Sequence, residues 1–200
     1  KKMTQYFDLA THKDDQGMLT VDVRGVGPLV TGPNVEEYHI ARSPADPDTG
    51  KPEGALQITR SQFSHDNIAT QFKGGRLGAM IEARDKHIGS LLDRLDELAF
   101  SVAESVNEIH QQGVTRDGLQ GVLFFKPHDQ VSRAAEMIGL SSAIQDSASN
   151  IATAAMANAP GDNRLALAIA NLQNAHIMKD GKVGFDDFYN SMVSDIGVAS

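Results

Sequence analysis

The longest uninterrupted pattern in the chain is a proline-free stretch at residues 74–113, "GGRLGAMIEARDKHIGSLLDRLDELAFSVAESVNEIHQQG", which lies between two glycine stops. Its apolar residues step by three and four, as on one face of an α-helix. The charged residues fall mostly outside this face, which is typical of a coiled-coil flank. The pattern predicts a long helix that needs partner helices, and its seam consists of Ile88, Leu91, Leu95, Leu98, Val102 and Ile109.

A different period precedes this stretch. Apolar and polar residues alternate over roughly 17–62, as they do in strands with one buried face. A segment with three prolines, 43–54, predicts an exposed loop. We therefore expect a small, mostly antiparallel sheet with strands at 18–23, 29–32, 35–42 and 55–60.

These patterns predict an α+β fold, namely a coiled-coil-like bundle of long helices with a small, mostly antiparallel β region. The opening "KKMTQYFDLA" has the character of the last turns of a truncated helix, and the chain ends where a helix could continue. We expect an excised fragment in five parts. They are the end of a truncated helix (1–13), a β-rich subdomain (14–70), the long helix (71–113), an irregular or short helical connection (114–160), and C-terminal helices that pack on the long helix (161–200).

Composition excludes several classes of protein. The net charge of −8 argues against nucleic acid as a partner, because a phosphate backbone requires a basic surface. No apolar run approaches the length of a membrane span, so we expect no membrane insertion. The chain has no cysteine, which removes disulfides, thiolate metal ligands and cysteine nucleophiles.

The stretch 179–188, "KDGKVGFDDF", resembles the second half of a calcium-binding loop. With Gly181 at the sixth loop position, His176 and Met178 occupy the first and third, where a hard cation needs oxygen ligands. Asp187 at the twelfth position is shorter than the usual glutamate. A calcium-binding module at 176–187 therefore stays only as the less favoured alternative. The preferred interpretation is a tight turn at Asp180-Gly181 followed by a helix with acidic residues at its start.

Other candidate sites are weaker. The glycines of "KGGRLG" (73–78) lack the Lys-Ser/Thr pair of a phosphate loop and are typical of a turn from strand to helix. The seven histidines show no H-x-x-x-H spacing, and no G-x-S-x-G elbow is present for a serine nucleophile. The sequence thus predicts no catalytic, cofactor-binding or metal residue, no cofactor, and a protein that is not an enzyme.

Five stretches in order resemble the family of the first flagellar hook-associated protein, which forms the hook–filament junction. They are "GGRLGAMIEARD" (74–85), the helix that ends in Asn107, His110 and Gly113, "GVLFFKP" (121–127), "APGDNRLALAIANLQ" (159–173) and "GFDDFYNSMVSDIG" (184–197). The β region matches this family only in general character. Family members also carry terminal helices that polymerise, so the resemblance implies a central fragment without them. It also implies C-terminal helices at 163–176 and 185–197, and Asp162 or Asn163 is the predicted cap of the first.

The resemblance implies a structural subunit of the bacterial flagellum, secreted and extracellular, at the junction between hook and filament. The implied partners are other copies in a ring, the hook protein, the next hook-associated protein and an export chaperone. Another axial protein, flagellin or a hook subunit, is the alternative within the same class.

Overall fold

The computed structural model describes residues 2–13, 15–43, 56–61, 63, 66–159 and 161–199. The chain divides into two compact units, an N-terminal unit (Lys1–Ser90) and a C-terminal unit (Leu91–Ser200). Helices and small antiparallel sheets are both present, so the α+β class is confirmed.

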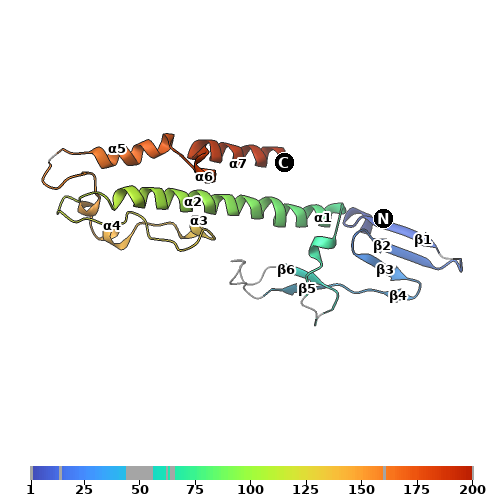
Figure 1. Cartoon of the computed structure of the whole chain (residues 1–200). Helices are drawn as coiled ribbons and strands as arrows, with labels where there is room; N and C mark the ends of the chain where they lie inside the picture. The colour runs from blue at the N-terminus through green and yellow to red at the C-terminus, as the bar shows by residue number, and fades with distance from the viewer. Residues whose placement is uncertain are drawn as a thin grey trace. The chain divides into compact units, whose positions relative to one another are not determined.

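The N-terminal unit is built on a four-stranded antiparallel sheet in the order β1-β2-β3-β4 (Figure 1). Its register pairs Leu9 with Val23 and Val21 with Val30, and a bulge lies between Val21 and Asp22. A separate ribbon pairs β5 with β6. The strands are β1 (Leu9–Lys13), β2 (Leu19–Val23), β3 (Gly27–Thr31), β4 (Asn34–Val35), β5 (His39–Arg42) and β6 (Leu56–Thr59).

The helix predicted at the N-terminus is wrong. Only a single 3₁₀ turn, η1 (Met3–Gln5), is helical there, and Leu9–Lys13 forms strand β1. The reason is tertiary, because five residues of this segment pair with β2 and pairing overrides a weak local preference. The strand predicted at 35–42 is interrupted between β4 and β5, and the predicted proline-rich loop lies, apart from Ser43, outside the described residues.

The core of the N-terminal unit lies where the sheet meets the first helical turns. A 3₁₀ turn, η2 (Ala69–Gln71), leads into α1 (Gly75–Glu82). Gly74 and Gly75 both have positive φ, and a Cβ on Gly75 would lie 2.6 Å from the Tyr6 carbonyl oxygen. The glycines thus permit a tight turn into the helix, as expected. The buried cluster consists of Val23, Val26, Ile68, Ala69, Phe72 and Ile81.

The helical run continues from α1 through a π-helical segment, η3 (Ala83–Ile88), into α2 (Gly89–His110). One long helix was predicted here, and the run is 36 residues long. Of the predicted seam, Ile88 is 53% exposed and the other five residues are half-buried. Four further side chains of α2 are buried. They are Ala103, Ser105, Asn107 and His110.

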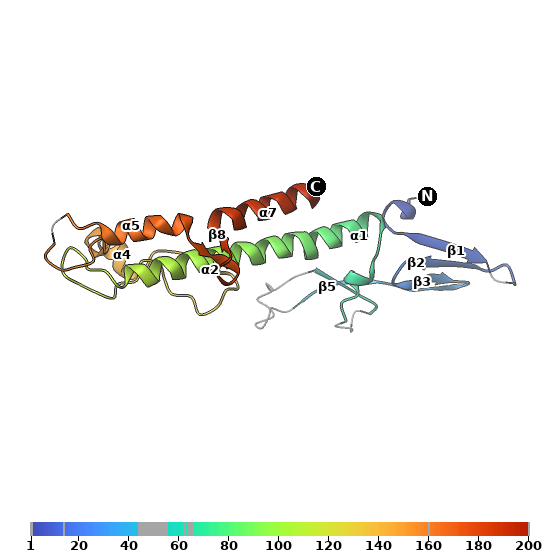
Figure 2. The same ribbon diagram turned by 45° about the horizontal axis from the view of Figure 1, so that its top comes forward.

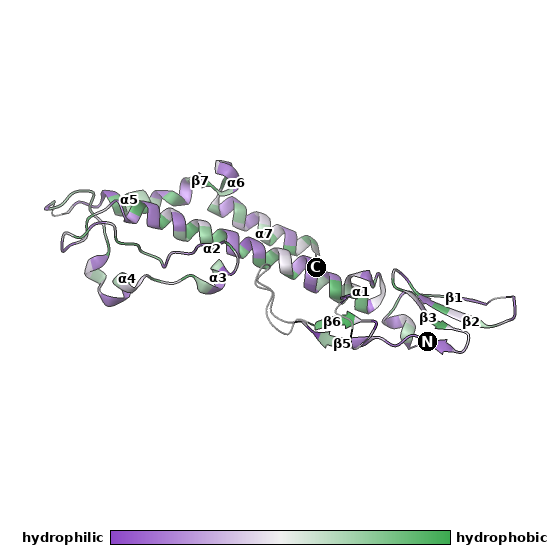
Figure 3. Cartoon of the chain, turned by 60° about the horizontal axis from the view of Figure 1, so that its bottom comes forward, coloured by the Kyte–Doolittle hydropathy of each residue, from purple (hydrophilic) through white to green (hydrophobic). Residues whose placement is uncertain are grey.

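In the C-terminal unit, α5 (Arg164–Asn171) and α7 (Phe185–Ala199) run along α2 in both views (Figures 1 and 2). Around α2 and α7, hydrophobic and hydrophilic residues alternate (Figure 3), as in helices with one covered face. The helix predicted at 163–176 ends early. It is followed by η5 (Leu172–Asn174), β7 (His176–Ile177), the turn α6 (Met178–Gly181) and β8 (Val183–Gly184).

The segment 114–160 contains only short helices. These are α3 (Ala134–Met137), α4 (Ser142–Asp146) and the 3₁₀ turn η4 (Ala148–Asn150). Isolated bridges join Val114 to Ala154 and Phe125 to Leu140, so the segment folds back on itself. Among the described residues, no helix is both long and apolar enough to span a membrane.

Candidate functional site

The last turns of α2 hold the segment 114–160 through the side chain of Asn107. Its Oδ1 accepts hydrogen bonds from the backbone N–H groups of Phe124 (2.9 Å) and Phe125 (2.8 Å). Its Nδ2 donates to the carbonyl oxygen of Phe125 at 3.1 Å. Asn107 is only 5% exposed, so one buried amide satisfies three backbone groups of a strand-like segment.

His110, one turn later on the same face, is fully buried and connects two further segments. Its Nδ1 lies 2.7 Å from the carbonyl oxygen of Val122, and its Nε2 lies 2.8 Å from the backbone nitrogen of Ala152. Because the Ala152 N–H donates, Nε2 must be the acceptor, and the proton sits on Nδ1 and points at Val122. The ring also packs edge-to-face on Phe124, at 5.4 Å between centroids.

Gly113 completes this arrangement by its lack of a side chain. A Cβ at this position would lie 2.1 Å from Cδ2 of Leu165 and 2.9 Å from Cβ of Ala152. The chain can therefore leave α2 and pass under α5 only with glycine here. We call Asn107, His110 and Gly113 the clasp; they are the three residues of the spacing noted in the sequence.

A fourth attachment lies about three turns before Asn107 on α2. The Asp96 carboxylate accepts the backbone N–H groups of Arg133 (2.6 Å) and Ala135 (2.9 Å). These are donors at the start of α3, which a helix leaves without internal partners. Arg133 has φ 64°, and its guanidinium pairs with Glu136 at 3.0 Å. Asp96 was interpreted as a solvated flank of a coiled coil, which is wrong because it caps a helix far along the chain.

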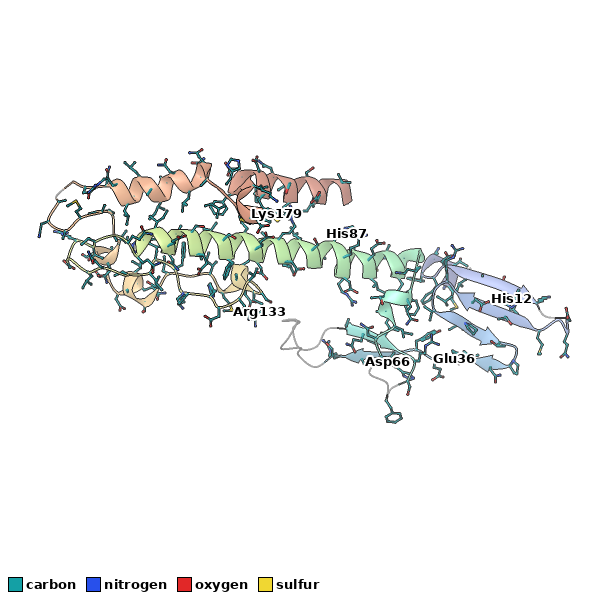
Figure 4. The ribbon with its side chains drawn as sticks, in the orientation of Figure 1. His12, Glu36, Asp66, His87, Arg133 and Lys179 are labelled. Carbon is teal, nitrogen blue, oxygen red and sulfur yellow. The ribbon has the colours of Figure 1, made fainter. Side chains whose placement is uncertain are left out.

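A separate contact fixes α7 on α2. The Arg94 guanidinium donates to the carboxylate of Asp195 and to Ser191 Oγ, and it stacks over the Phe188 ring at 5.2 Å. The ammonium of Lys179 lies 5.7 Å from the same ring centroid. Phe188 is 1% exposed, so it is the central buried residue of this contact. Lys179 and Arg133 lie on opposite sides of α2 (Figure 4), so the helix is covered from two directions.

Asp162 organises the turn before α5. Its carboxylate accepts the backbone N–H groups of Ala155 (2.9 Å) and Arg164 (3.2 Å) and pairs with the Arg164 guanidinium at 2.9 Å. The guanidinium is the main reason that the pKa of this carboxyl lies well below its ordinary value, and the backbone donors act in the same direction. Asp162 or Asn163 was predicted as the helix cap, and Asp162 makes these bonds.

The calcium-loop-like stretch forms a small hairpin instead. His176 pairs with Gly184 and Met178 bridges Val183, so Met178 is buried in the turn at 1% exposure. Lys179, Asp180 and Gly181 all have positive φ, which closes the turn. In the described parts of the chain, no group of three or more His, Asp or Glu side chains could hold a metal ion. The absence of catalytic, cofactor and metal residues stays a prediction.

The comparison with known families explains the resemblance. The sequence profile described as "Flagellar hook-associated protein FlgK helical domain" matches residues 1–125, which is more than half of the chain. The chain belongs to the FlgK family. The FlgK match contains all three clasp residues and Asp96, whereas α5 and α7 lie beyond it.

Two further proteins are similar to this chain. Flagellar hook-associated protein 1 of Bacillus subtilis (strain 168) is 25% identical over 201 residues, covering 92% of this chain and 39% of that protein. The solved structure of the flagellar hook junction protein FlgK from Burkholderia pseudomallei matches with a TM-score of 0.51 and 24% identity. It covers 64% of this chain and 23% of the solved chain, and this likeness supports the fold alone. The chain thus spans about two fifths of the curated relative.

Sequence reasoning missed the residues that hold the C-terminal unit together. Asn107 and His110 were noticed only through the family resemblance, and Arg94 was counted among flanking charges. The apolar pattern did not mark Asn107, because this residue lies roughly 140° around the helix from the centre of the predicted seam. Buried polar residues need partners, and here the partners are backbone groups, which leave no trace in a sequence pattern.

Proposed function

We propose that the chain is a structural subunit of the bacterial flagellum and contributes to the junction between hook and filament. The observation that supports this most strongly is the FlgK family match over residues 1–125. The similar protein from Burkholderia pseudomallei is a hook junction protein, which agrees with this proposal. The family is a structural one, and we infer that this chain works through its surfaces and is not an enzyme.

The proposal includes the organisation of the subunit. The long helix acts as a spine on which a coiled-coil-like bundle is built, and the division at residues 70, 113 and 160 describes its segments. In support, α7 contacts α2 through Arg94, and the clasp joins α2 to the segment 114–160. Self-assembly with other copies is the main interaction. The hook protein, the next hook-associated protein and an export chaperone are the further proposed partners, with secretion to the extracellular flagellum.

The alternatives are less favoured. A flagellin or a hook subunit would share the class of axial protein, but the matching profile and both similar proteins are hook-associated proteins. A calcium-binding module at 176–187 would need oxygen ligands at its first positions, and Met178 is instead buried in the hairpin.

Deletion of the gene in the source bacterium tests the proposal. We expect cells that keep hooks but lack filaments in electron micrographs, with motility restored by the full-length protein. Cells that lose the hook itself would assign the chain to the hook, and cells with normal filaments would contradict any role at the junction. A full-length variant with Gln111→Ala, an exposed position between His110 and Gly113, serves as the matched control for substitutions within the clasp.

A further inference from the structure

Charge is distributed unequally between the two units. The N-terminal unit contains 11 Lys and Arg against 12 Asp and Glu, a net charge of −1. The C-terminal unit contains 7 against 14, a net charge of −7. Nearly all of the net negative charge of the chain therefore lies in the C-terminal unit. The nearly neutral N-terminal unit can have a locally basic surface.

Such a basic surface lies at the entry to α1. Arg24 and Lys73 are neighbours, because the backbone N–H of Lys73 donates to the Arg24 carbonyl oxygen at 3.5 Å. Arg76 follows in the first turn of α1, where the next residue, Leu77, donates its N–H to the Tyr6 carbonyl oxygen. Arg24, Lys73 and Arg76 are all exposed, and we call them the basic cluster.

Only one acidic side chain is paired with this cluster. Asp8 lies 2.9 Å from Nε of Arg24. Among the described residues, Lys73 and Arg76 have no ion-pair partner within the chain. The Asp8 carboxylate also lies beside the start of α1, where its Oδ2 would be 3.2 Å from a Cβ on Gly74. With Arg24, Lys73 and Arg76 against Asp8, the cluster has a net charge of +2.

An acidic counterpart exists on α2. Asp93, Glu97, Glu104 and Glu108 are spaced by 4, 7 and 4 residues. At 3.6 residues per turn they fall within about 60° of one another around the helix. Asp93, Glu104 and Glu108 are exposed and Glu97 is half-buried. We call these four residues the acidic face.

The acidic face is not used by the contacts within the C-terminal unit. Arg94 faces α7, and Asp96, Asn107 and His110 face the segment 114–160. The four carboxylates form no ion pair with any described residue. Half-buried Phe100 lies among them on the same helical face, so the surface combines charge with some apolar area.

We propose that the basic cluster of one copy docks on the acidic face of a second copy. The inference rests on the proposed function as a self-assembling subunit, and it names the surfaces that meet. Two different patches that complement each other make a heterologous interface, which repeats from copy to copy and closes into a ring when the rotation permits. Opposite charge on the two patches guides the encounter and fixes the register.

A second copy is the occupant that the charges favour. A face of four carboxylates on an identical neighbour offers localised negative charge, and an assembly of identical copies presents it in equal number to the basic cluster.

Charge reversal on each side tests the proposal with the 200-residue chain. One variant carries Lys73→Glu with Arg76→Glu, and the other carries Glu97→Lys with Glu104→Lys. We expect the wild-type chain to self-associate weakly in sedimentation velocity at low salt, and added salt to weaken the association because exposed charges are screened. Each variant alone should associate at least about tenfold more weakly than the wild type.

Mixing the two variants provides the decisive comparison. The first variant keeps the acidic face and the second keeps the basic cluster, so a 1:1 mixture retains one native pairing and should associate although neither variant does so alone. A control with Lys126→Glu and Lys182→Glu changes the net charge equally at exposed positions elsewhere and should behave like the wild type. A monomeric wild-type chain at low salt, or a mixture that fails to associate, would overturn the proposal.

The same variants in the full-length protein separate this inference from the proposed function. If deletion of the gene removes filaments but both reversals support normal motility, the function stands and the docking surfaces are wrong. If deletion leaves filaments intact, the function fails, whatever the chain does in solution.

Discussion

Asn107→Ala is the substitution that tests the clasp most directly. The change removes the acceptor of two backbone N–H groups, on Phe124 and Phe125, and the donor to one carbonyl oxygen. A buried polar group left without a partner costs about 1–3 kcal/mol. Two buried N–H groups without an acceptor would therefore lower the free energy of unfolding by about 2–6 kcal/mol. The higher helix propensity of alanine would offset roughly 0.5 kcal/mol of this loss. Because Phe124 and Phe125 are only half-buried, we expect the lower end, a loss of about 2–3 kcal/mol in the free energy of unfolding of the C-terminal unit.

Hydrogen exchange measured by NMR gives the most specific readout. The amides of Phe124 and Phe125 should lose protection by a factor of about 30 to 150, which corresponds to 2–3 kcal/mol at 1.4 kcal/mol per decade. Urea unfolding followed by circular dichroism should show a lower midpoint, and Gln111→Ala should leave both measurements within about 0.5 kcal/mol of the wild type. Unchanged protection of these two amides in Asn107→Ala would refute the reasoning that the side chain holds this segment.

Four further substitutions test separate contacts. Gly113→Ala should destabilise the fold by about 1–3 kcal/mol in urea unfolding, because its Cβ would meet Cδ2 of Leu165 at 2.1 Å. If that overlap is the cause, Leu165→Ala should cost less stability in the Gly113→Ala background than it does alone, and an equal cost would contradict this. Arg94→Ala should speed hydrogen exchange in α7, by about 1 kcal/mol of local stability, and Arg94→Lys should only partly restore it. The pKa of Asp162 is lower in the folded chain than in the unfolded chain, so its stabilisation is complete above the ordinary aspartate pKa and is lost as the pH falls towards the folded value. Asp162→Asn should therefore flatten the fall of the unfolding midpoint below about pH 4, and an unchanged pH profile would contradict this. Tyr38→Phe should leave stability unchanged or raise it by up to about 1 kcal/mol, because Tyr38 Oη is buried without a partner among the described residues and burial raises the pKa of this hydroxyl.

The sequence predicted the elements whose own pattern decides them. Strand β2 follows from the alternation at 18–23, and the long helix follows from apolar spacing without proline. Strand β1 was missed because "KKMTQYFDLA" has no strand pattern and becomes extended only by pairing with β2. The early end of α5 was missed for a related reason, since the hairpin from His176 to Gly184 takes residues that could have continued the helix.

The path of the segment 114–160 along α2 could not be predicted, because α2 binds it through backbone groups. Asn107 and His110 bond to main-chain atoms of residues 122, 124, 125 and 152, which every residue except proline possesses in the same form. A periodic pattern records which side chains are apolar, and it carries no information on where a backbone group finds its partner. The same limit applies to Asp96, whose bonds also go to main-chain N–H groups.

Recognition through backbone groups has a consequence for protein engineering. Since the clasp bonds to main-chain atoms and its side-chain contacts lie at Phe124, Ala152 and Leu165, the exposed residues elsewhere between 114 and 159 should accept wholesale replacement. An insert that preserves the backbone positions at 122–125 and 152 would still be held by Asn107 and His110. The end of α2 thus offers a graft site, where foreign peptide could be displayed on a rigid support without redesign of the support itself.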